Sequence, residues 1–568
     1  MEKKSNKYDV CIIGSGAGAG PIIYELSLAG YNVLVLEKGP WFRTKDFTKD
    51  EIVATRRSVY TPNLEHERHV IESLDAMGNW IGSSTYDTGN DWWNGNCVGG
   101  SSNFMSGFFH RSKPDDFRLL SKFGKIDGAN IEDWPITYDE LEPYYSKVEK
   151  IVGVSGKVQQ SKYSEPRSTT DFPYPPLQEH LLSTWIDKAA KNLKYDVIAM
   201  PRAILSKPEP DRSSCSYSNF CGSYGCSTDA KGSSRVTLIH KALKTGNCKV
   251  ITNAKAYHLE TNGNRQIIKA WYHNAEGKNE FVEANFFVVA AQAIETSRLL
   301  LMSKNPDFPN GLSNNNEQVG KNLLFSAGGG GSGELNVKDF DEKTEMLLKM
   351  PGVFINRTLM EFYEISDVLT GKKIKGGTVD FLLEHANAIT KATNRKRDDE
   401  GNLQTGKELK NEIKNYFSNI VKLKFEVFAD WLPNNNCFVS LDSKVKDKWG
   451  DPVAKIRIGG HPHDLNVGQF LAEKAELLLK EMGLKKISSD INSLPPPNIQ
   501  AGGCRFGEDP KTSVLDPDCK SHEVENLYIS DGSFMPTGGS VTYTWTIYAN
   551  SFRVADKILD RLKSPKNN

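Results

Sequence analysis

YDVCIIGSGAGAGPIIYELSLAGYNVLVLE, residues 8–37, is the stretch that decides the fold of this chain. Its apolar start (8–13) predicts a buried β-strand, its glycine-rich turn opens a helix that runs through Leu28, and a second apolar run (31–36) predicts another strand. Together these elements form a β-α-β unit of the length that binds a dinucleotide. The sequence therefore predicts a dinucleotide site at the turn between the first strand and the helix.

Four residues of this unit suit such a site. Gly14 makes the tight turn, Gly16 lets a pyrophosphate approach the backbone, and Ala19 allows the helix to pack closely on the strand. Glu37 ends the second strand, twenty-one residues after Gly16, where a carboxylate accepts hydrogen bonds from an adenosine ribose. A glycine turn without a ligand is the alternative, but the two strands and the terminal acid together favour the dinucleotide.

The composition excludes several classes of protein. Lys and Arg (71) balance Asp and Glu (71), so the chain lacks the positive charge typical of a nucleic-acid-binding protein. No apolar run approaches the ~20 residues of a transmembrane helix, and nine cysteines in 568 residues are too few for a disulfide scaffold. The polar, lysine-rich residues 1–7 leave no room for a secretory signal, so we expect none.

Strand and helix patterns further along the chain extend the first unit. An apolar run at 285–291 leads into a helix that begins at Ala293, and a strand from Asn526 ends at an acid ahead of a helix at 546–562. Both would join the first sheet. The predicted fold class is α/β (α+β overall), a Rossmann-like dinucleotide domain assembled from discontinuous segments plus a β-sheet substrate-binding cap domain with strands such as 422–429 and 453–458. The predicted boundaries are 1–150, 246–325 and 491–568 for the first domain, and 151–245 and 326–490, with a cysteine-rich loop at 212–234, for the second.

Four further motifs occur in a fixed order along nearly the whole chain. They are NCVGGSSN (96–103), WPITYDELEPYY (134–145), GGCRFGEDPKTSV (502–514) and NLYISDGSFMPTGGS (526–540). With these motifs the chain resembles the glucose-methanol-choline (GMC) family of flavin oxidoreductases. The resemblance implies FAD rather than NAD at the glycine turn.

The resemblance also implies which other residues surround the flavin. The loop after Gly99 would lie against the flavin with Asn103 near the isoalloxazine, and Asp531 would lie near the ribityl chain or the pyrophosphate. Covalent linkage in some relatives uses a histidine in this loop, where this chain has Asn103, Phe104 and Met105, so we expect noncovalent FAD. The residues expected to contact the cofactor beyond the first unit are Gly99, Gly100, Ser101, Asn103, Asp531, Gly532 and Thr542.

Three cysteines gather in CSYSNFCGSYGC, residues 215–226. Thiolates on a glycine-bearing loop can converge on iron, and the three ligands Cys215, Cys221 and Cys226 suit a [3Fe-4S] cluster, whereas a mononuclear zinc would want a fourth. The segment resembles the cysteine loop of cluster-bearing flavoprotein subunits of bacterial glucose, gluconate and glucoside dehydrogenases. It also resembles a loop of long-chain alcohol oxidases for which no cluster is implied, so a free or disulfide-linked loop is the alternative.

Flavin-dependent alcohol oxidation needs an acceptor for the proton of the substrate hydroxyl while hydride leaves to the flavin. The resemblance places a catalytic histidine, and a second histidine or asparagine, at positions that are Ile499 and Thr542 here, so neither expected side chain is present. Either a histidine from another loop supplies the base, or hydrogen-bonding side chains serve a substrate that needs no strong base, or the chain binds FAD without turnover. The tentative catalytic residues are His461, His463, Gln500, Thr542 and Tyr543, with His110 as a weaker candidate.

These features predict an FAD-dependent dehydrogenase that oxidises a sugar, glycoside or other alcohol. Its electrons would leave through the iron–sulfur cluster to a partner. The resemblance further implies a small signal-bearing partner subunit, a cytochrome acceptor, and a periplasmic site reached through that subunit; without the subunit, the site would be cytoplasmic. The alternatives are a non-catalytic or electron-relay subunit with a degenerate active site, and an oxidase or lyase of the same fold.

Overall fold

The computed structural model describes residues 7–56, 59–90, 92, 94–325, 327–366, 371–398, 400–491 and 499–564. The absence of a secretory signal was predicted from residues 1–7, of which 1–6 lie outside this range. Among the described residues, no helix is both long enough and apolar enough to cross a bilayer.

The predicted β-α-β unit forms the centre of a sheet that has seven strands in the described part of the chain. The predicted strands near residues 285 and 526 join it, because β9 pairs in parallel with β1, and β19 pairs in parallel with β9. Three distant segments thus build one sheet, as the sequence predicts. In spatial order the strands are β6 (Cys248–Ile251), β2 (Val33–Leu36), β1 (Tyr8–Ile13), β9 (Asn279–Val289), β8 (Ile267–His273) and β7 (Lys255–Thr261), with β19 (Leu527–Ile529) on β9.

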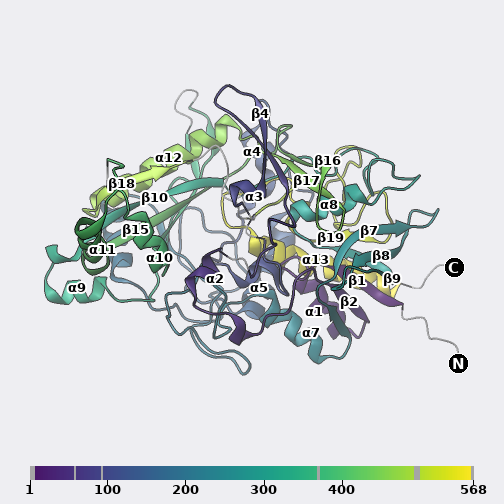
Figure 1. Ribbon diagram of the computed structural model, residues 1–568, viewed down its shortest axis with the longest axis horizontal. Coiled ribbons are helices and arrows are strands. Elements are labelled where there is room, and N and C mark those ends of the chain that lie inside the picture. Colours follow the sequence, from purple (N-terminus) through teal and green to yellow (C-terminus); the bar gives the residue numbers. More distant parts are fainter. Residues whose placement is uncertain are drawn as a thin grey trace.

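Helices from three parts of the sequence pack beside this sheet (Figure 1). The C-terminal helix α13 (Thr544–Lys563) contacts both α1 (Gly20–Leu28) and α5 (Tyr138–Val152). A capping box of Thr137 and Glu140 starts α5, since each side chain accepts a hydrogen bond from the other residue's backbone N–H. Buried residues of all these elements share one hydrophobic core, which holds the N- and C-terminal segments together. Two more helices border the sheet, α7 (His240–Lys244) and α8 (Ala293–Met302).

A second sheet, whose strands do not follow their order in the sequence, forms the other half of the molecule, on the left of Figure 1. Its neighbouring strands pair in antiparallel fashion, and α12 (Pro462–Glu481) and α6 (Leu181–Leu193) contribute to its core. The predicted strand at 422–429 is β15 of this sheet. In spatial order the strands are β18 (Lys485–Asp490), β10 (Ala327–Asn336), β15 (Ile420–Ala429), β14 (Gly377–Leu383), β11 (Arg357–Leu359) and β5 (Val197–Ala199).

The strand predicted at 453–458 exists, but it does not belong to this second sheet. It is β17 (Pro452–Arg457), which pairs in parallel with β3 (Val70–Leu74). Its apolar side chains pack with those of α8, because Ala454 and Ile456 share a cluster with Ile294. The stretch therefore contributes to a small sheet beside the first domain, together with β16 (Phe438–Lys446) and β4 (Trp80–Ser84).

The remaining elements are short or lie at the surface. The charged segment that follows β14 forms α10 (Ala388–Asn394) and α11 (Gly406–Asn419). The other helices are α2 (Glu51–Arg56), α3 (Thr85–Thr88), α4 (Leu119–Phe123) and α9 (Glu342–Leu348), and the other strands are β12 (Glu364–Ser366) and β13 (Lys373–Lys375). Single helical turns lie at Thr44–Asp46, Gly100–Asn103, Pro114–Arg118, Arg235–Ile239, Val337–Asp339 and Gly532–Phe534.

Candidate active site

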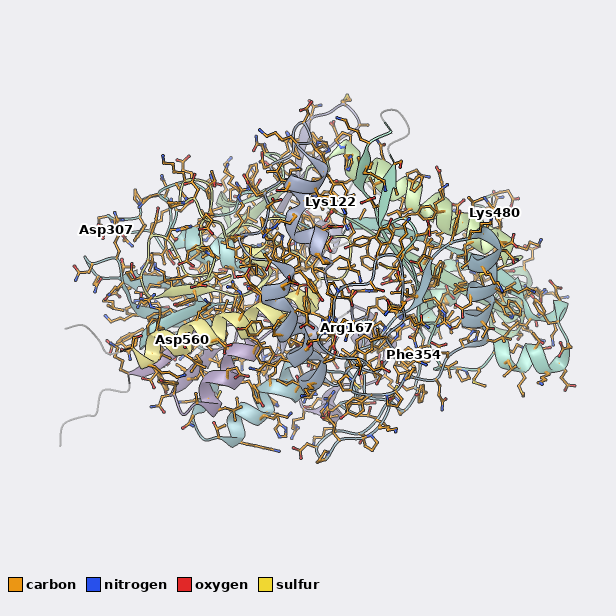
Figure 2. All side chains as sticks on the ribbon, turned by 180° about the vertical axis from the view of Figure 1, so that it is seen from behind. Lys122, Arg167, Asp307, Phe354, Lys480 and Asp560 are labelled. Atoms are coloured by element: carbon orange, nitrogen blue, oxygen red, sulfur yellow. The ribbon has the colours of Figure 1, made fainter. Side chains whose placement is uncertain are left out.

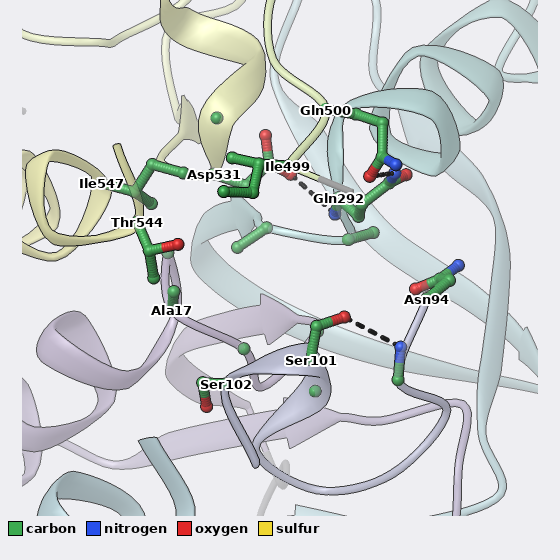
Figure 3. A pocket seen from close by; sticks show the side chains of 18 of the residues that line it. Ala17, Asn94, Ser101, Ser102, Gln292, Ile499, Gln500, Asp531, Thr544 and Ile547 are labelled. Carbon is green, nitrogen blue, oxygen red and sulfur yellow. Dashed lines mark hydrogen bonds between the residues drawn. The ribbon is translucent and has the colours of Figure 1, made fainter. Parts of the chain in front are cut away.

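A cavity of about 340 Å³ extends from the glycine turn after β1 to strand β15 of the second sheet. Its walls also include the loop at 100–108, the start of α8 and the C-terminal segment around Thr542 (Figure 3). Side chains from both halves of the molecule therefore meet in this cavity. A buried cleft of this kind, at the carboxyl ends of parallel strands, is where dinucleotides bind in such sheets.

The glycine turn has the shape that a pyrophosphate needs. Gly14 has φ +94°, and a Cβ added there would lie 2.2 Å from the carbonyl oxygen of Ala290. Gly16 differs, because no atom lies within 4 Å of an added Cβ and the residue lines the cavity. Ala19 is fully buried at the start of α1 and does not line the cavity, in line with its predicted packing role. The turn thus fits the diphosphate of FAD at Gly16.

Glu37, directly after β2, lines the cavity. Ser15 Oγ donates a hydrogen bond to its Oε2 (2.5 Å), and the backbone N–H of Gly39 donates one to its Oε1 (2.8 Å). Burial raises the pKa of this carboxyl to about 7, although both hydrogen bonds and the charge of Lys38 lower it. The two hydrogen bonds fix the carboxyl at the place where the sequence predicts an adenosine ribose.

The loop at 99–103 lines the cavity only in part. Gly100 and Ser101 line it, and the backbone N–H of Gly99 donates to Ser15 Oγ (3.0 Å), which ties the loop to the glycine turn. Asn103 is not among the lining residues, and its place near the isoalloxazine stays a prediction. Its Nδ2 donates to the carbonyl oxygens of Val98 and Gly100 (both 3.0 Å), so the side chain is used to close the loop.

Asp531 and Gly532 also line the cavity. The Asp531 carboxylate accepts hydrogen bonds from the Gln292 N–H (3.0 Å) and from Thr296 Oγ1 (2.5 Å) at one oxygen, and from the Ser533 N–H (2.9 Å) at the other. Burial raises the pKa of this carboxyl. Asp531 therefore joins the end of β19 to the start of α8 beside the glycine turn.

The two positions that lack the expected catalytic side chains, Ile499 and Thr542, both line the cavity. Thr542 Oγ1 is buried and has no hydrogen-bond partner among the described residues. Ile499 has φ +52°, which is rare for a β-branched residue, and its carbonyl oxygen accepts a hydrogen bond from the Tyr543 hydroxyl. Tyr543 is fully buried outside the cavity wall, so its hydroxyl supports the backbone at Ile499 and is not available to a substrate.

Gln500 lines the cavity as one member of a pair of amides. Its Oε1 accepts a hydrogen bond from Gln292 Nε2 (2.5 Å), and its Nε2 donates to the carbonyl oxygen of Trp92 (3.0 Å), as Figure 3 shows for the two glutamines. Gln292 itself has φ +82° and caps α8. The pair connects the C-terminal segment to α8 at the edge of the cavity.

None of the three histidines proposed as a base from the sequence lines this cavity. His461 caps α12, where its Nδ1 accepts from the His463 N–H (3.2 Å) and its Nε2 lies 2.8 Å from the carbonyl oxygen of Asp127. His463 lines a separate hollow of about 30 Å³. His110 is buried with its Nε2 3.1 Å from Asp380. The His-Pro-His sequence begins a helix, and that helix holds both of its histidines away from the cavity.

The structure adds titratable side chains that sequence reasoning missed, and two of them lie at the second sheet. His385, just after β14, and Glu426, on β15 beside Phe428, line the end of the cavity formed by the second sheet. Burial and the charge of Lys424 lower the pKa of His385 to about 4, so its imidazole is neutral, and burial raises the pKa of Glu426. The alternating pattern of β15 indicates a strand, but it does not say which face meets the cofactor.

The three cysteines that the sequence predicts to bind iron pack on one small group of apolar side chains. This group contains Leu205 and Phe354, and Phe354 is labelled in Figure 2. All three thiols are free, so the disulfide-linked alternative is wrong for this structure. Among the described residues, no group of three or more His, Cys, Asp or Glu side chains could hold a metal ion. The described structure therefore does not bring Cys215, Cys221 and Cys226 together as a metal-binding group.

Comparison with solved structures supports the same fold. A variant of formate oxidase from Aspergillus oryzae is 15% identical with a TM-score of 0.63, and the match covers 99% of this chain and 100% of that one. Pyridoxine 4-oxidase from Mesorbium loti is 15% identical with a TM-score of 0.59, over 97% and 99% of the two chains.

Among proteins with known activities, 2-methyl-1,2-propanediol dehydrogenase of Mycolicibacterium austroafricanum is 28% identical, over 100% of this chain and 99% of its own. The fructose dehydrogenase large subunit of Gluconobacter japonicus is 26% identical, over 99% and 100%. The sequence profiles of GMC oxidoreductases match residues 82–326 for the N-terminal region and 433–551 for the C-terminal region, more than half of the chain. The chain therefore belongs to the GMC oxidoreductase family.

Proposed function

We propose that this chain oxidises a CH–OH group of a sugar, glycoside or other alcohol, with FAD as the acceptor of hydride. The observation that carries the proposal is the continuity of the cavity, which joins the glycine turn to Thr542, His385 and Glu426. A dinucleotide at Gly16 would leave the polar end of the cavity for a hydroxyl-bearing substrate. Similarity to fructose dehydrogenase and to 6'''-hydroxyparomomycin C oxidase of Streptomyces lividus supports this substrate class.

The residues at the polar end of the cavity can orient such a substrate. When bound, FAD supplies the two-electron acceptor. Thr542 Oγ1 has an unused donor and acceptor, so it can hydrogen-bond the substrate hydroxyl. Phe428 and Trp545 add apolar wall to the same cavity, which would help to exclude water from the reacting carbon. Gln500 is already paired with Gln292 and therefore shapes the cavity.

The test is turnover of a panel of alcohols and sugars, including fructose and gluconate, with an artificial electron acceptor and separately with oxygen. The proposal predicts carbonyl product with the artificial acceptor and little hydrogen peroxide with oxygen. Peroxide at the rate of carbonyl formation would identify an oxidase, and products without net oxidation would identify a lyase. Bound FAD without turnover of any compound would favour a non-catalytic subunit.

We also propose, from the sequence resemblance, that Cys215, Cys221 and Cys226 bind a [3Fe-4S] cluster that carries electrons onward. One feature supports it: Gly222, between Cys221 and Cys226, lines the active-site cavity. Binding would require the loop to draw the thiols together around the iron. Protein prepared without oxygen should then contain about three irons and acid-labile sulfide per chain, and protein prepared in that way without iron would contradict the proposal.

The electron acceptor and the location rest on the resemblance alone. We propose a small signal-bearing subunit, a cytochrome acceptor, and a periplasmic site reached through that subunit. The similarity to the fructose dehydrogenase large subunit, whose name implies a further subunit there, supports the first part. Fractionation of the native host with an antibody to this chain tests the location, and active chain found alone in the cytosol would contradict it.

A further inference from the structure

We propose that His385 accepts the proton of the substrate hydroxyl, and that the cysteine-rich loop is the scaffold that holds its imidazole in the cavity. The inference deepens the proposed function and rests on it. It gives the reaction a base in place of the histidine that is missing at Ile499. It also gives the loop a role that does not depend on iron.

The imidazole of His385 meets the conditions for a base. It lines the cavity that Thr542 and the glycine turn share, and no described residue forms a hydrogen bond with its ring. Burial and the positive charges of Lys424 and Lys231 keep it neutral, which leaves a nitrogen lone pair for the proton. Glu426 lines the same cavity, and burial raises the pKa of its carboxyl.

The cysteine-rich loop touches the imidazole directly at Gly222. A Cβ added to Gly222 would lie 2.4 Å from His385 Cε1 and 2.8 Å from Nε2. Only a residue without a side chain lets the ring occupy this place. The glycine between two of the cysteines is thus explained by the position of His385.

Hydrogen bonds fix this loop on both sides of the cavity. Lys231 Nζ donates to the carbonyl oxygens of Cys221 (3.1 Å), Tyr224 (2.6 Å) and Met105 (2.9 Å), and Met105 lines the cavity, so the loop is tied to its wall. On the other side, the Tyr224 hydroxyl donates to Asn387 Oδ1 (2.8 Å), two residues after His385. The loop therefore sets the distance between the His385 segment and the wall that faces the cofactor.

The reaction balances with these groups. The carbon–hydrogen bond of the substrate would break and both of its electrons would leave with the hydrogen as hydride, for which bound FAD would supply the acceptor, while the hydroxyl proton would move to the imidazole and the C–O bond would become C=O. The substrate loses two electrons and two protons in all. An external acceptor then takes the two electrons from the flavin, and the imidazolium releases its proton to water before the next turnover.

The first test compares His385→Ala with His240→Ala, the same substitution at an exposed histidine of α7. With a substrate that bleaches the wild-type flavin under anaerobic conditions, His385→Ala should slow bleaching by roughly 100- to 10,000-fold, the usual effect of a lost general base, with FAD content unchanged. Added imidazole should restore part of the rate and saturate. His240→Ala should match the wild type.

A binding measurement, which needs no turnover, tests the position of the His385 ring. Calorimetry should show that imidazole binds the flavin-free His385→Ala protein and does not bind the flavin-free wild type, because only the variant has a ring-shaped space beside Gly222. Absence of binding to the variant would contradict the described position of His385.

The second test concerns the scaffold. Gly222→Ala adds one methyl group against the ring and should lower kcat by about 100-fold, the effect of a displaced catalytic group. Tyr224→Phe removes the hydrogen bond to Asn387 and should lower kcat more than it changes KM. Wild-type kcat in Gly222→Ala would refute the role of the loop.

The outcomes separate the inference from the function on which it rests. If no compound bleaches the wild-type flavin, the proposed function fails. If the wild type is bleached and His385→Ala is bleached at the same rate, the function stands and the role of His385 is wrong. If His385→Ala is slow but imidazole neither binds nor restores the rate, His385 is a structural residue.

Discussion

We expect FAD binding to depend most directly on Gly16. Its added Cβ would meet no protein atom within 4 Å, so a larger side chain is tolerated by the fold but fills the space of the pyrophosphate. Gly16→Val should reduce bound FAD to below about one-tenth of a molecule per chain, a loss larger than 1.4 kcal/mol of binding. The measurement is the flavin released by acid, which also confirms noncovalent attachment.

The control for Gly16→Val is Gly263→Val in the turn between β7 and β8. An added Cβ at Gly263 also meets no atom within 4 Å, but that turn does not line the cavity. Its flavin content should equal that of the wild type. A yellow Gly16→Val protein would place the pyrophosphate elsewhere.

Glu37 should make the stability of the flavin-free protein depend on pH. Its pKa is raised from 4.5 to about 7 by burial, so the folded state binds the proton more tightly than the unfolded state. The stability that this proton provides is complete below about pH 4.5 and is lost as pH rises through about 7, a loss of about 3 kcal/mol.

Urea unfolding at pH 5 and pH 8 measures this effect as the difference between the wild type and Glu37→Gln. The comparison is needed because other buried carboxyls, such as Asp430 with a pKa raised to about 6, act in the same direction. The variant should lose less stability over this range. Equal losses in both proteins would show that Glu37 is ionised in the folded state.

At the scale of elements, strand β10 shows how closely the second sheet is packed. It contains four consecutive glycines, 328–331, between β15 and β18. A Cβ at Gly331 would lie 2.3 Å from Phe425 Cζ and 2.5 Å from the carbonyl oxygen of Ser488. Gly331→Ala should therefore destabilise the protein by about 1–3 kcal/mol through overpacking.

The measurement is the midpoint of urea unfolding followed by circular dichroism. Gly263→Ala adds the same methyl group in open space and should change stability by less than about 0.5 kcal/mol. If Gly331→Ala unfolds at the same midpoint as the wild type, the packing of β10 against β15 is looser than described.

The elements also show what the sequence can predict. The unit from Tyr8 to Glu37 was predicted because its turn, helix and strands are adjacent, so local patterns specify it. His385 was missed, because it reaches the cavity only through the pairing of β14 with β15 and through Gly222, which lies 163 positions earlier in the chain. The histidines of 461–463 are only tentative candidates from the sequence, because a His-Pro-His run does not show in which direction the helix that it starts will point.

At the scale of the whole molecule, the active site exists only where distant segments meet. The glycine turn, the cysteine-rich loop, β15 and the C-terminal segment all line one cavity. Family motifs located the flavin-side segments, but they did not locate the substrate side, where contacts between distant segments decide which residues face the cavity. The same reason explains why the sequence does not assign β17 to its sheet. Its strand pattern is local, whereas its partner β3 lies nearly 400 residues earlier.

The most direct test of the central claim is a single turnover without oxygen or any added acceptor. FAD-loaded protein is mixed with each member of the alcohol and sugar panel, and the visible flavin absorbance and the carbonyl product are both measured. We predict that at least one compound bleaches the flavin and yields one carbonyl per flavin reduced. A flavin that dithionite bleaches but that no alcohol or sugar of a broad panel reduces would contradict the claim that this chain oxidises CH–OH groups.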